Sequence, residues 1–139
     1  MKVVVDTNVL ISGVFFGGAP RRVVEAVAGR QIEASATPEI MEEYDRVVRE
    51  MVRRGQGRLR TDALSVLLSR IRIDEPATTV AVCRDPDDDK FIACAIDAGA
   101  LYVVSGDRDL LDLGSYEGVD MITAADFCER YLTEKGSTP

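Results

Sequence analysis

Short apolar runs that alternate with helical segments constrain the fold of this chain more than any other feature. Lys2–Val5 is a β-branched run that ends abruptly at Asp6, which is typical of a buried central strand. Strands are expected at residues 2–5, 32–36, 101–104 and 119–123. Helices are expected at residues 20–28, 61–70, 85–98 and 123–131, and after Asp6, Thr37 and Asp107. This alternation predicts a three-layer α/β/α sandwich around a mostly parallel sheet.

The 139 residues are enough for one domain with its own core. We expect that domain over residues 1–133, followed by a flexible tail at 134–139. The least defined part is the stretch before the acidic helix, where Ile71–Asp74 and Thr79–Cys83 are both candidates for short extended segments.

Composition excludes several kinds of site. The chain has no His, and its three cysteines are widely spaced and follow no metal-ligand pattern, so zinc sites and Ser-His or Cys-His catalytic pairs are ruled out. The net charge of -7 argues against binding nucleic acid by bulk attraction, although local basic patches remain compatible with it. No apolar run has the length of a membrane span, and we expect a cytoplasmic protein with no membrane partner.

Four carboxylates crowd the start of the helix at 85–98, which is more charge than a helix cap requires. Asp85 precedes Pro86 and suits the cap position. Asp88 lies on the same stripe as Phe91 and Ile92, because it precedes them by three and four residues. Asp89 is rotated toward the other edge and is the alternative to Asp88 as a site residue.

The helix that opens at Thr37–Pro38 carries two neighbouring glutamates with different expected environments. Placing residues at about 100° intervals puts Glu42 on the solvent face. Glu43 follows Ile40 by three residues and precedes Val47 by four, at the margin of the buried face. Glu43 is therefore the better candidate for a site.

Asp6, Glu43, Asp88 and Asp107 are expected to meet at one edge of the sheet. Asp6 and Asp107 lie near strand ends, and ligands of such sheets bind beyond the carboxyl ends of the strands. Each acid alone has an ordinary explanation as a cap or a solvated carboxylate, but gathering them without a partner raises their pKa values at a cost in stability. Oxygen-only ligands suit Mg²⁺ or Mn²⁺, and the chemistry expected there is metal-assisted hydrolysis of a phosphodiester.

Four segments, in this order, resemble the PIN-domain ribonucleases, and within them the VapC-like toxins of toxin–antitoxin systems. They are Val-Val-Val-Asp-Thr-Asn-Val-Leu-Ile-Ser at 3–12, Thr-Pro-Glu-Ile-Met-Glu-Glu-Tyr at 37–44, Cys-Arg-Asp-Pro-Asp-Asp-Asp-Lys-Phe-Ile-Ala at 83–93, and Val-Ser-Gly-Asp-Arg-Asp-Leu-Leu at 104–111. The resemblance covers almost the whole chain.

The resemblance implies a PIN-like fold and an endoribonuclease that uses Mg²⁺ or Mn²⁺, forms homodimers and is inhibited by a small antitoxin protein. Its acidic quartet matches Asp6, Glu43, Asp88 and Asp107, which would be catalytic and metal-binding, with Asp89 and Asp109 as further candidate ligands. Ser105, Thr7 and Asn8 would position the substrate.

The densest basic segment, residues 46–60, is the candidate RNA-binding region, with Arg53, Arg54 and Arg58 as the residues expected to contact phosphates. The competing interpretation is a solvated helix face paired with Glu42, Asp45 and Glu50.

The sequence also bears on three other functions. A phosphotransfer receiver domain requires a lysine at a late strand end, where neither Lys90 nor Lys135 lies. A haloacid-dehalogenase-type phosphatase requires Asp-X-Asp after the first strand, where this chain has Asp6-Thr7-Asn8. The stronger alternative is a PIN fold that binds RNA or a protein without cutting.

Overall fold

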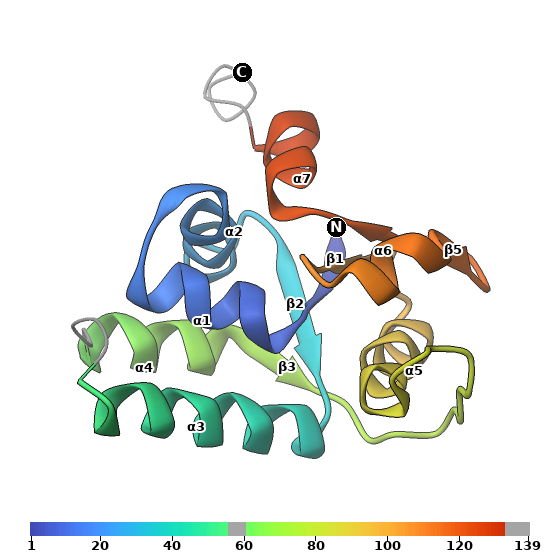
Figure 1. The fold of residues 1–139 in the computed structure, drawn as a ribbon. Helices are drawn as coiled ribbons and strands as arrows, with labels where there is room; N and C mark the ends of the chain where they lie inside the picture. Colours follow the sequence, from blue (N-terminus) through green and yellow to red (C-terminus); the bar gives the residue numbers. More distant parts are fainter. Residues whose placement is uncertain (56–60, 133–139) are drawn as a thin grey trace.

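The structure, a computed structural model, describes residues 1–55 and 61–132, and these build one sheet with the strand order β3-β2-β1-β4-β6-β5 (Figure 1). The strands are β1 (Lys2–Val5), β2 (Glu33–Ala36), β3 (Ile71–Ile73), β4 (Tyr102–Val104), β5 (Ser115–Tyr116) and β6 (Val119–Ile122). Neighbouring strands are parallel except for β5, which pairs antiparallel with β6. The predicted mostly parallel α/β fold is confirmed.

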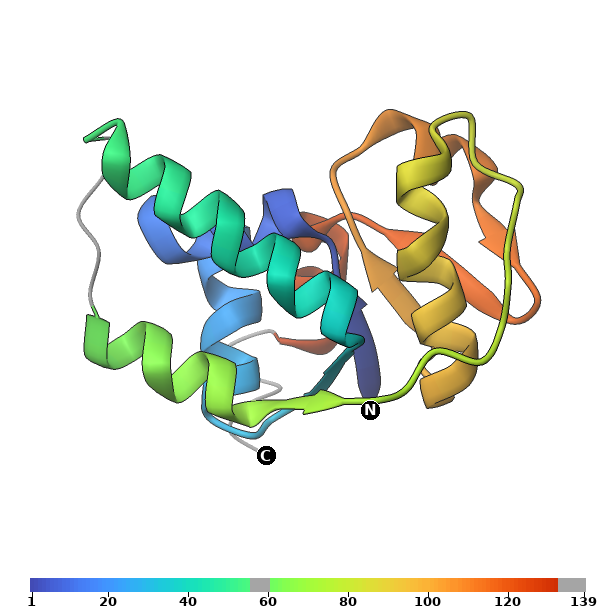
Figure 2. The ribbon, with the colours of Figure 1, turned by 90° about the horizontal axis from the view of Figure 1, so that it is seen from below.

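Helices cover both faces of the sheet, and Figure 2 shows the two helical layers on either side of the strands. The helices are α1 (Thr7–Phe15), α2 (Gly18–Ala28), α3 (Pro38–Arg53), α4 (Thr61–Arg70), the 3-10 turn η1 (Pro86–Asp88), α5 (Asp89–Ala98), α6 (Arg108–Leu113) and α7 (Ala124–Tyr131). Helices α1 to α4 and α7 pack on one another on one side, whereas α5 lies on the other side against β1, β2, β4 and β6.

The core lies on both faces of the sheet around β1 and β2. Val3 and Val4 are fully buried in β1, and Ile40 and Ile92 reach the strands from α3 and α5 with no exposed surface. Tyr44 is also buried, and its hydroxyl donates a hydrogen bond to the carbonyl of Val5. This bond holds the first half of α3 against the end of β1, and therefore next to Asp6.

Only one of the two candidate extended segments before η1 joins the sheet. Ile71–Ile73 forms β3, but Thr79–Cys83 forms no strand. The backbone N–H groups of Val82 and Cys83 donate instead to Oδ1 of Asp89, at 3.1 and 2.9 Å. A side-chain carboxylate satisfies this stretch of backbone, so the stretch has no need of a neighbouring strand.

The structure also contains an element that the sequence did not predict. Strand β5 turns into β6 through Glu117 and Gly118, whose φ angles of 51° and 82° suit a tight hairpin. With two residues, β5 is too short to show an alternating pattern. The tail predicted at 134–139 lies outside the described residues, and none of the described helices is long and apolar enough to cross a membrane.

Candidate metal centre

Parallel strands deliver two aspartates to the same edge of the sheet. Asp6 follows β1 directly, and Asp107 follows β4 after two residues. The backbone N–H of Asp6 donates to the carbonyl of Val104 at 3.0 Å, which ties the ends of the two strands together. Helix α3, the turn η1 and helix α6 bring Glu43, Asp88 and Asp109 to this edge, where ligands of parallel sheets bind.

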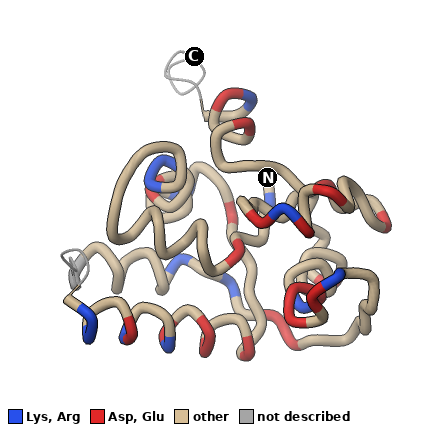
Figure 3. Tube along the Cα trace, in the orientation of Figure 1, with Lys and Arg blue, Asp and Glu red and all other residues tan. Residues whose placement is uncertain are grey.

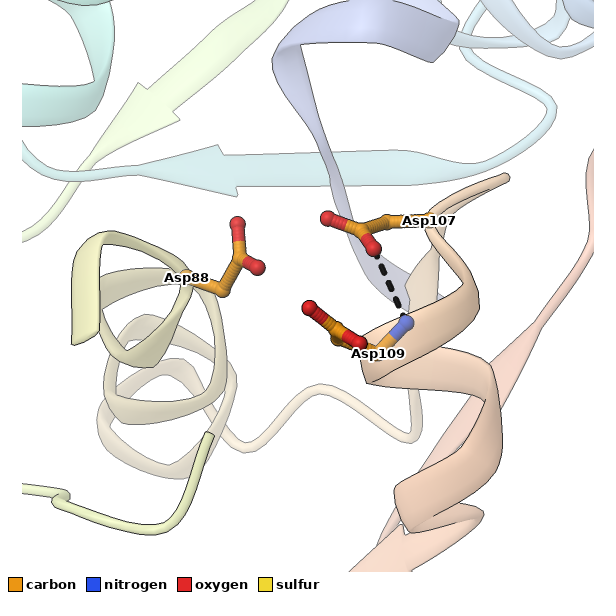
Figure 4. A group of neighbouring side chains, drawn as sticks. All are labelled: Asp88, Asp107 and Asp109. Carbon is orange, nitrogen blue, oxygen red and sulfur yellow. Dashed lines mark hydrogen bonds between the residues drawn. The ribbon is translucent and has the colours of Figure 1, made fainter. Parts of the chain in front are cut away.

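Asp88, Asp107 and Asp109 form a compact group of carboxylates. Each offers one oxygen, and these oxygens all lie within 4.8 Å of one another. Figure 4 shows Asp88, from η1, pointing across a gap toward Asp107 and Asp109 at the start of α6. All three side chains are half-buried, so they are both held in place and reachable from solvent.

Asp6 is linked to this group through Ser105 and is almost fully buried. Its Oδ1 accepts the N–H of Val9 at 2.9 Å, and its Oδ2 accepts the hydroxyl of Ser105. The Ser105 oxygen also accepts the N–H of Asp107 at 2.9 Å, so one buried hydroxyl links the two aspartates. Burial raises the pKa of Asp6, hydrogen bonds lower it, and the charges of Asp107 and Glu43 add to the rise.

Helix capping accounts for three of the acids near the site but not for Asp88. Asp6, Asp85 and Asp107 each accept a backbone N–H at a helix start, at 2.9, 3.0 and 2.9 Å. Asp88 makes no capping bond, and its buried Oδ2 has no hydrogen-bond partner among the described residues. Burial first, and then the neighbouring Asp107, raise the pKa of Asp88 to about 7.

Glu43 lies at the same edge but has its own partners. Its Oε2 accepts the hydroxyl of Thr7, and its Oε1 lies 2.8 Å from Nζ of Lys90 and 3.7 Å from Arg46. The structure places Glu43 at the margin of the buried face and Glu42 in solvent, as the helical register predicted. Glu43 is not a member of the compact carboxylate group formed by Asp88, Asp107 and Asp109.

Asp89, the alternative to Asp88, has a different environment. It is buried, and its Oδ1 holds the backbone of Val82 and Cys83. Burial alone would raise the pKa of Asp89, but hydrogen bonds from these two residues lower it below its usual value. The structure therefore separates the two aspartates, with Asp88 directed at the carboxylate group and Asp89 at the loop.

Two basic residues that sequence reasoning left out of the site lie within it. The Lys90 side chain is 10% exposed, and hydrogen bonds to Glu43 and Asp87 raise its pKa although burial opposes that rise. Arg84 lies 3.2 Å from Asp109 and is largely exposed. Arg84 directly precedes the acidic run, and that adjacency is a sequence signal by which it could have been found. Lys90 reaches Glu43 only through the tertiary fold.

Two of the three predicted RNA-binding arginines, Arg53 and Arg54, lie at the far end of α3, and Figure 3 shows basic and acidic positions side by side along this helix. Arg53 and Arg54 both pair with Glu50, which matches the competing interpretation of a solvated, ion-paired helix face. Ten residues of helix separate Arg53 from Glu43, or about 15 Å at the usual rise. Arg58 lies outside the described residues.

Asn8 and Ser12 line a hollow next to the carboxylates. Its volume is about 380 Å³, and its other walls include Ala19, Gly106 and Asp107. Asn8 is exposed, so its amide is available to a ligand, whereas the Thr7 hydroxyl is already bonded to Glu43.

The residues present fit a hard divalent cation. Every candidate donor in the group is a carboxylate oxygen, which suits Mg²⁺ or Mn²⁺. The unpartnered Oδ2 of Asp88 and the raised pKa of Asp88 are both consistent with a carboxylate arranged to face a positive charge.

Comparisons with known proteins agree with the fold and the motifs. A family model described as PIN domain matches residues 2–109. An uncharacterized protein of Methanocaldococcus jannaschii is 32% identical over 117 residues, which are 81% of this chain and 75% of that protein.

A solved structure shares the fold at low sequence identity. It is the crystal structure of VapBC2 from Rickettsia felis bound to a DNA fragment from its promoter. One of its chains superposes with a TM-score of 0.58 at 13% identity, covering 88% of this chain and 98% of that chain.

Proposed function

This chain belongs to the PIN-domain family, and on that premise we propose that it is an Mg²⁺- or Mn²⁺-dependent endoribonuclease, the toxin of a toxin–antitoxin pair. The observation that carries the proposal is the convergence of Asp88, Asp107 and Asp109, with a buried oxygen of Asp88 that no described residue satisfies. A module that only binds RNA or protein has no need to keep such a carboxylate unpartnered, because the arrangement costs stability.

In this proposal Asp88, Asp107 and Asp109 hold the cation, with Asp6 beside them. A bound Mg²⁺ or Mn²⁺ supplies an activated water and neutralises charge that develops on the phosphodiester. Ser105 fixes the orientation of Asp6 and of the Asp107 backbone. Thr7 fixes Glu43.

RNA is held next to the carboxylates by groups that the fold leaves exposed. Asn8 offers its amide to a sugar or phosphate from the wall of the hollow beside Asp107. Arg84 offers a guanidinium to a phosphate from its place beside Asp109. The sequence predicts the same role for Arg53, Arg54 and Arg58, and of these Arg53 and Arg54 lie at the far end of α3 from Glu43.

The partners follow from the toxin assignment. We propose a small antitoxin protein as inhibitor and a homodimer as the working form, acting on RNA in the cytoplasm. Support comes from the motifs at 3–12, 37–44, 83–93 and 104–111, and from the shared fold with a chain of VapBC2.

The test of this function is an RNA cleavage assay with purified protein. Single-stranded and structured RNAs are incubated with Mn²⁺ and the wild-type protein, beside Asp6→Asn and Asp88→Asn variants and an EDTA control. Asp112→Asn, an exposed carboxylate on α6, is the matched control. We expect internal cleavage that the two site variants and EDTA abolish and that Asp112→Asn retains. RNA binding without any cleavage would favour the non-catalytic alternative.

A further inference from the structure

The ammonium group of Lys90 is enclosed between two carboxylates at the edge of the metal centre. Its side chain is 10% exposed, and that of Glu43 is 14% exposed. Lys90 Nζ lies 2.8 Å from Oε1 of Glu43 and 2.9 Å from Oδ1 of Asp87. Lys90 therefore joins α5 to α3.

Three oxygens lie within 2.9 Å of Lys90 Nζ. Besides the two carboxylates, Nζ donates to the backbone carbonyl of Asp87 at 2.8 Å. An ammonium has three donors and no acceptor, so these three oxygens match its capacity and a phosphate of the substrate would have to displace one of them. Together with its enclosure, this makes Lys90 a positioning residue and not a contact for RNA.

Both oxygens of Glu43 are in use as well. Lys90 holds Oε1, and the Thr7 hydroxyl holds Oε2. Glu43 lies outside the group of Asp88, Asp107 and Asp109, whose oxygens come within 4.8 Å of one another. A positive charge already neutralises Glu43, whereas Asp88 has an oxygen with no partner among the described residues.

We propose that Lys90 takes the place of a second divalent cation, so that this enzyme works with a single metal ion. Lys90 holds Glu43 away from the compact group and supplies the positive charge that a second ion would otherwise bring to that side of the site. Asp88, Asp107 and Asp109 are left as the ligands of the one ion. This inference rests on the proposed metal-dependent function and specifies its stoichiometry.

The inference is tested by counting bound Mn²⁺ in RNA-free protein, from the loss of the free-ion signal in electron paramagnetic resonance. We expect one equivalent for the wild type and for Lys90→Arg, which keeps the charge. Lys90→Met removes the charge at similar length and should expose Glu43, so that a second equivalent binds. The double variant Lys90→Met/Glu43→Gln should return to one equivalent.

Arg46→Met is the matched control, because Arg46 is the other cation near Glu43 but is 72% exposed. Arg46→Met should still bind one equivalent of Mn²⁺. That result would show that a second ion binds because the enclosed charge of Lys90 is lost, and not because the net charge has changed. Two equivalents of similar affinity in the wild type, or one unchanged equivalent in Lys90→Met, would overturn the inference.

A second measurement covers the case in which Lys90→Met does not fold. Glu43→Gln in a chain that retains Lys90 should bind its one Mn²⁺ within about threefold of the wild-type affinity. Asp107→Asn should weaken binding by about tenfold or more. Equal losses in the two variants would contradict the single-ion arrangement. One bound ion without RNA cleavage would instead count against the proposed function alone.

Discussion

The carboxylates of Asp88 and Asp107 face each other from η1 and the start of α6, with oxygens within 4.8 Å. Asp107 caps α6 through the N–H of Asp109, whereas Asp88 caps nothing and keeps one buried oxygen without a described partner. Like charges this close raise each other's pKa, and a shared proton or a bound cation relieves the repulsion.

The first prediction concerns the pH dependence of stability. The pKa of Asp88 is raised to about 7, so the folded state binds more protons than the unfolded state between about pH 4 and 7. Stability of the metal-free protein should therefore fall as pH rises through this window. Thermal melts in EDTA would show the effect, and Asp88→Asn should reduce the slope while Asp112→Asn leaves it unchanged.

Mn²⁺ should reverse that loss at neutral pH, because an ion that binds only the folded state raises the melting temperature. An Asp88→Asn protein with the same pH slope as the wild type would contradict the assignment of the raised pKa to Asp88.

Part of the site could be predicted from the sequence, and the two glutamates of α3 show why. The helical register was enough to separate Glu43 from Glu42, and strand ends were enough to bring Asp6 near Asp107. The environment of Asp89 could not be predicted, because it depends on the path of the loop at Val82 and Cys83. The contact of Lys90 with Glu43 spans 47 positions of the chain and depends on how α5 and α3 pack across β1, which no local pattern encodes.

The second prediction concerns Ser105, which links Asp6 to the backbone of Asp107. Ser105→Ala should lower Mn²⁺ affinity or cleavage by about 10- to 100-fold, as is usual for residues that orient metal ligands. Ser69→Ala, an exposed serine on α4, is the control and should have no effect. Single-turnover cleavage rates and Mn²⁺ titrations measure both variants. Equal cleavage rates for the two variants would show that Ser105 does not orient the metal ligands.

The third prediction separates Asp89 from Asp88. Asp89→Ala leaves the N–H groups of Val82 and Cys83 without their acceptor and should destabilise the fold by about 1–3 kcal/mol. The pKa of Asp89 is lowered, so its contribution is present at neutral pH and is lost as pH falls below about 4. Urea unfolding at pH 7 measures the cost. A stable Asp89→Ala protein that no longer binds Mn²⁺ would restore Asp89 as a ligand.

The fourth prediction compares the two groups of arginines. Arg84 lies beside Asp109, whereas Arg53 and Arg54 pair with Glu50 at the far end of α3. Arg84→Ala should weaken RNA binding and reduce its salt dependence by about one phosphate contact. The variant Arg53→Ala/Arg54→Ala/Arg58→Ala tests the original prediction in the same titration. A larger loss in the triple variant than in Arg84→Ala would place RNA along α3.

Anomalous scattering from crystals soaked in Mn²⁺ tests the central claim most directly, because it locates the ion without any assay of activity. The arrangement of Asp88, Asp107 and Asp109 predicts one strong peak between their carboxylates, with Asp6 next to it, and no second peak at Glu43. Crystals of Asp88→Asn should lose the peak, and crystals of Asp112→Asn should keep it. A wild-type map with no peak among these three aspartates would contradict the metal centre, and with it the proposed nuclease.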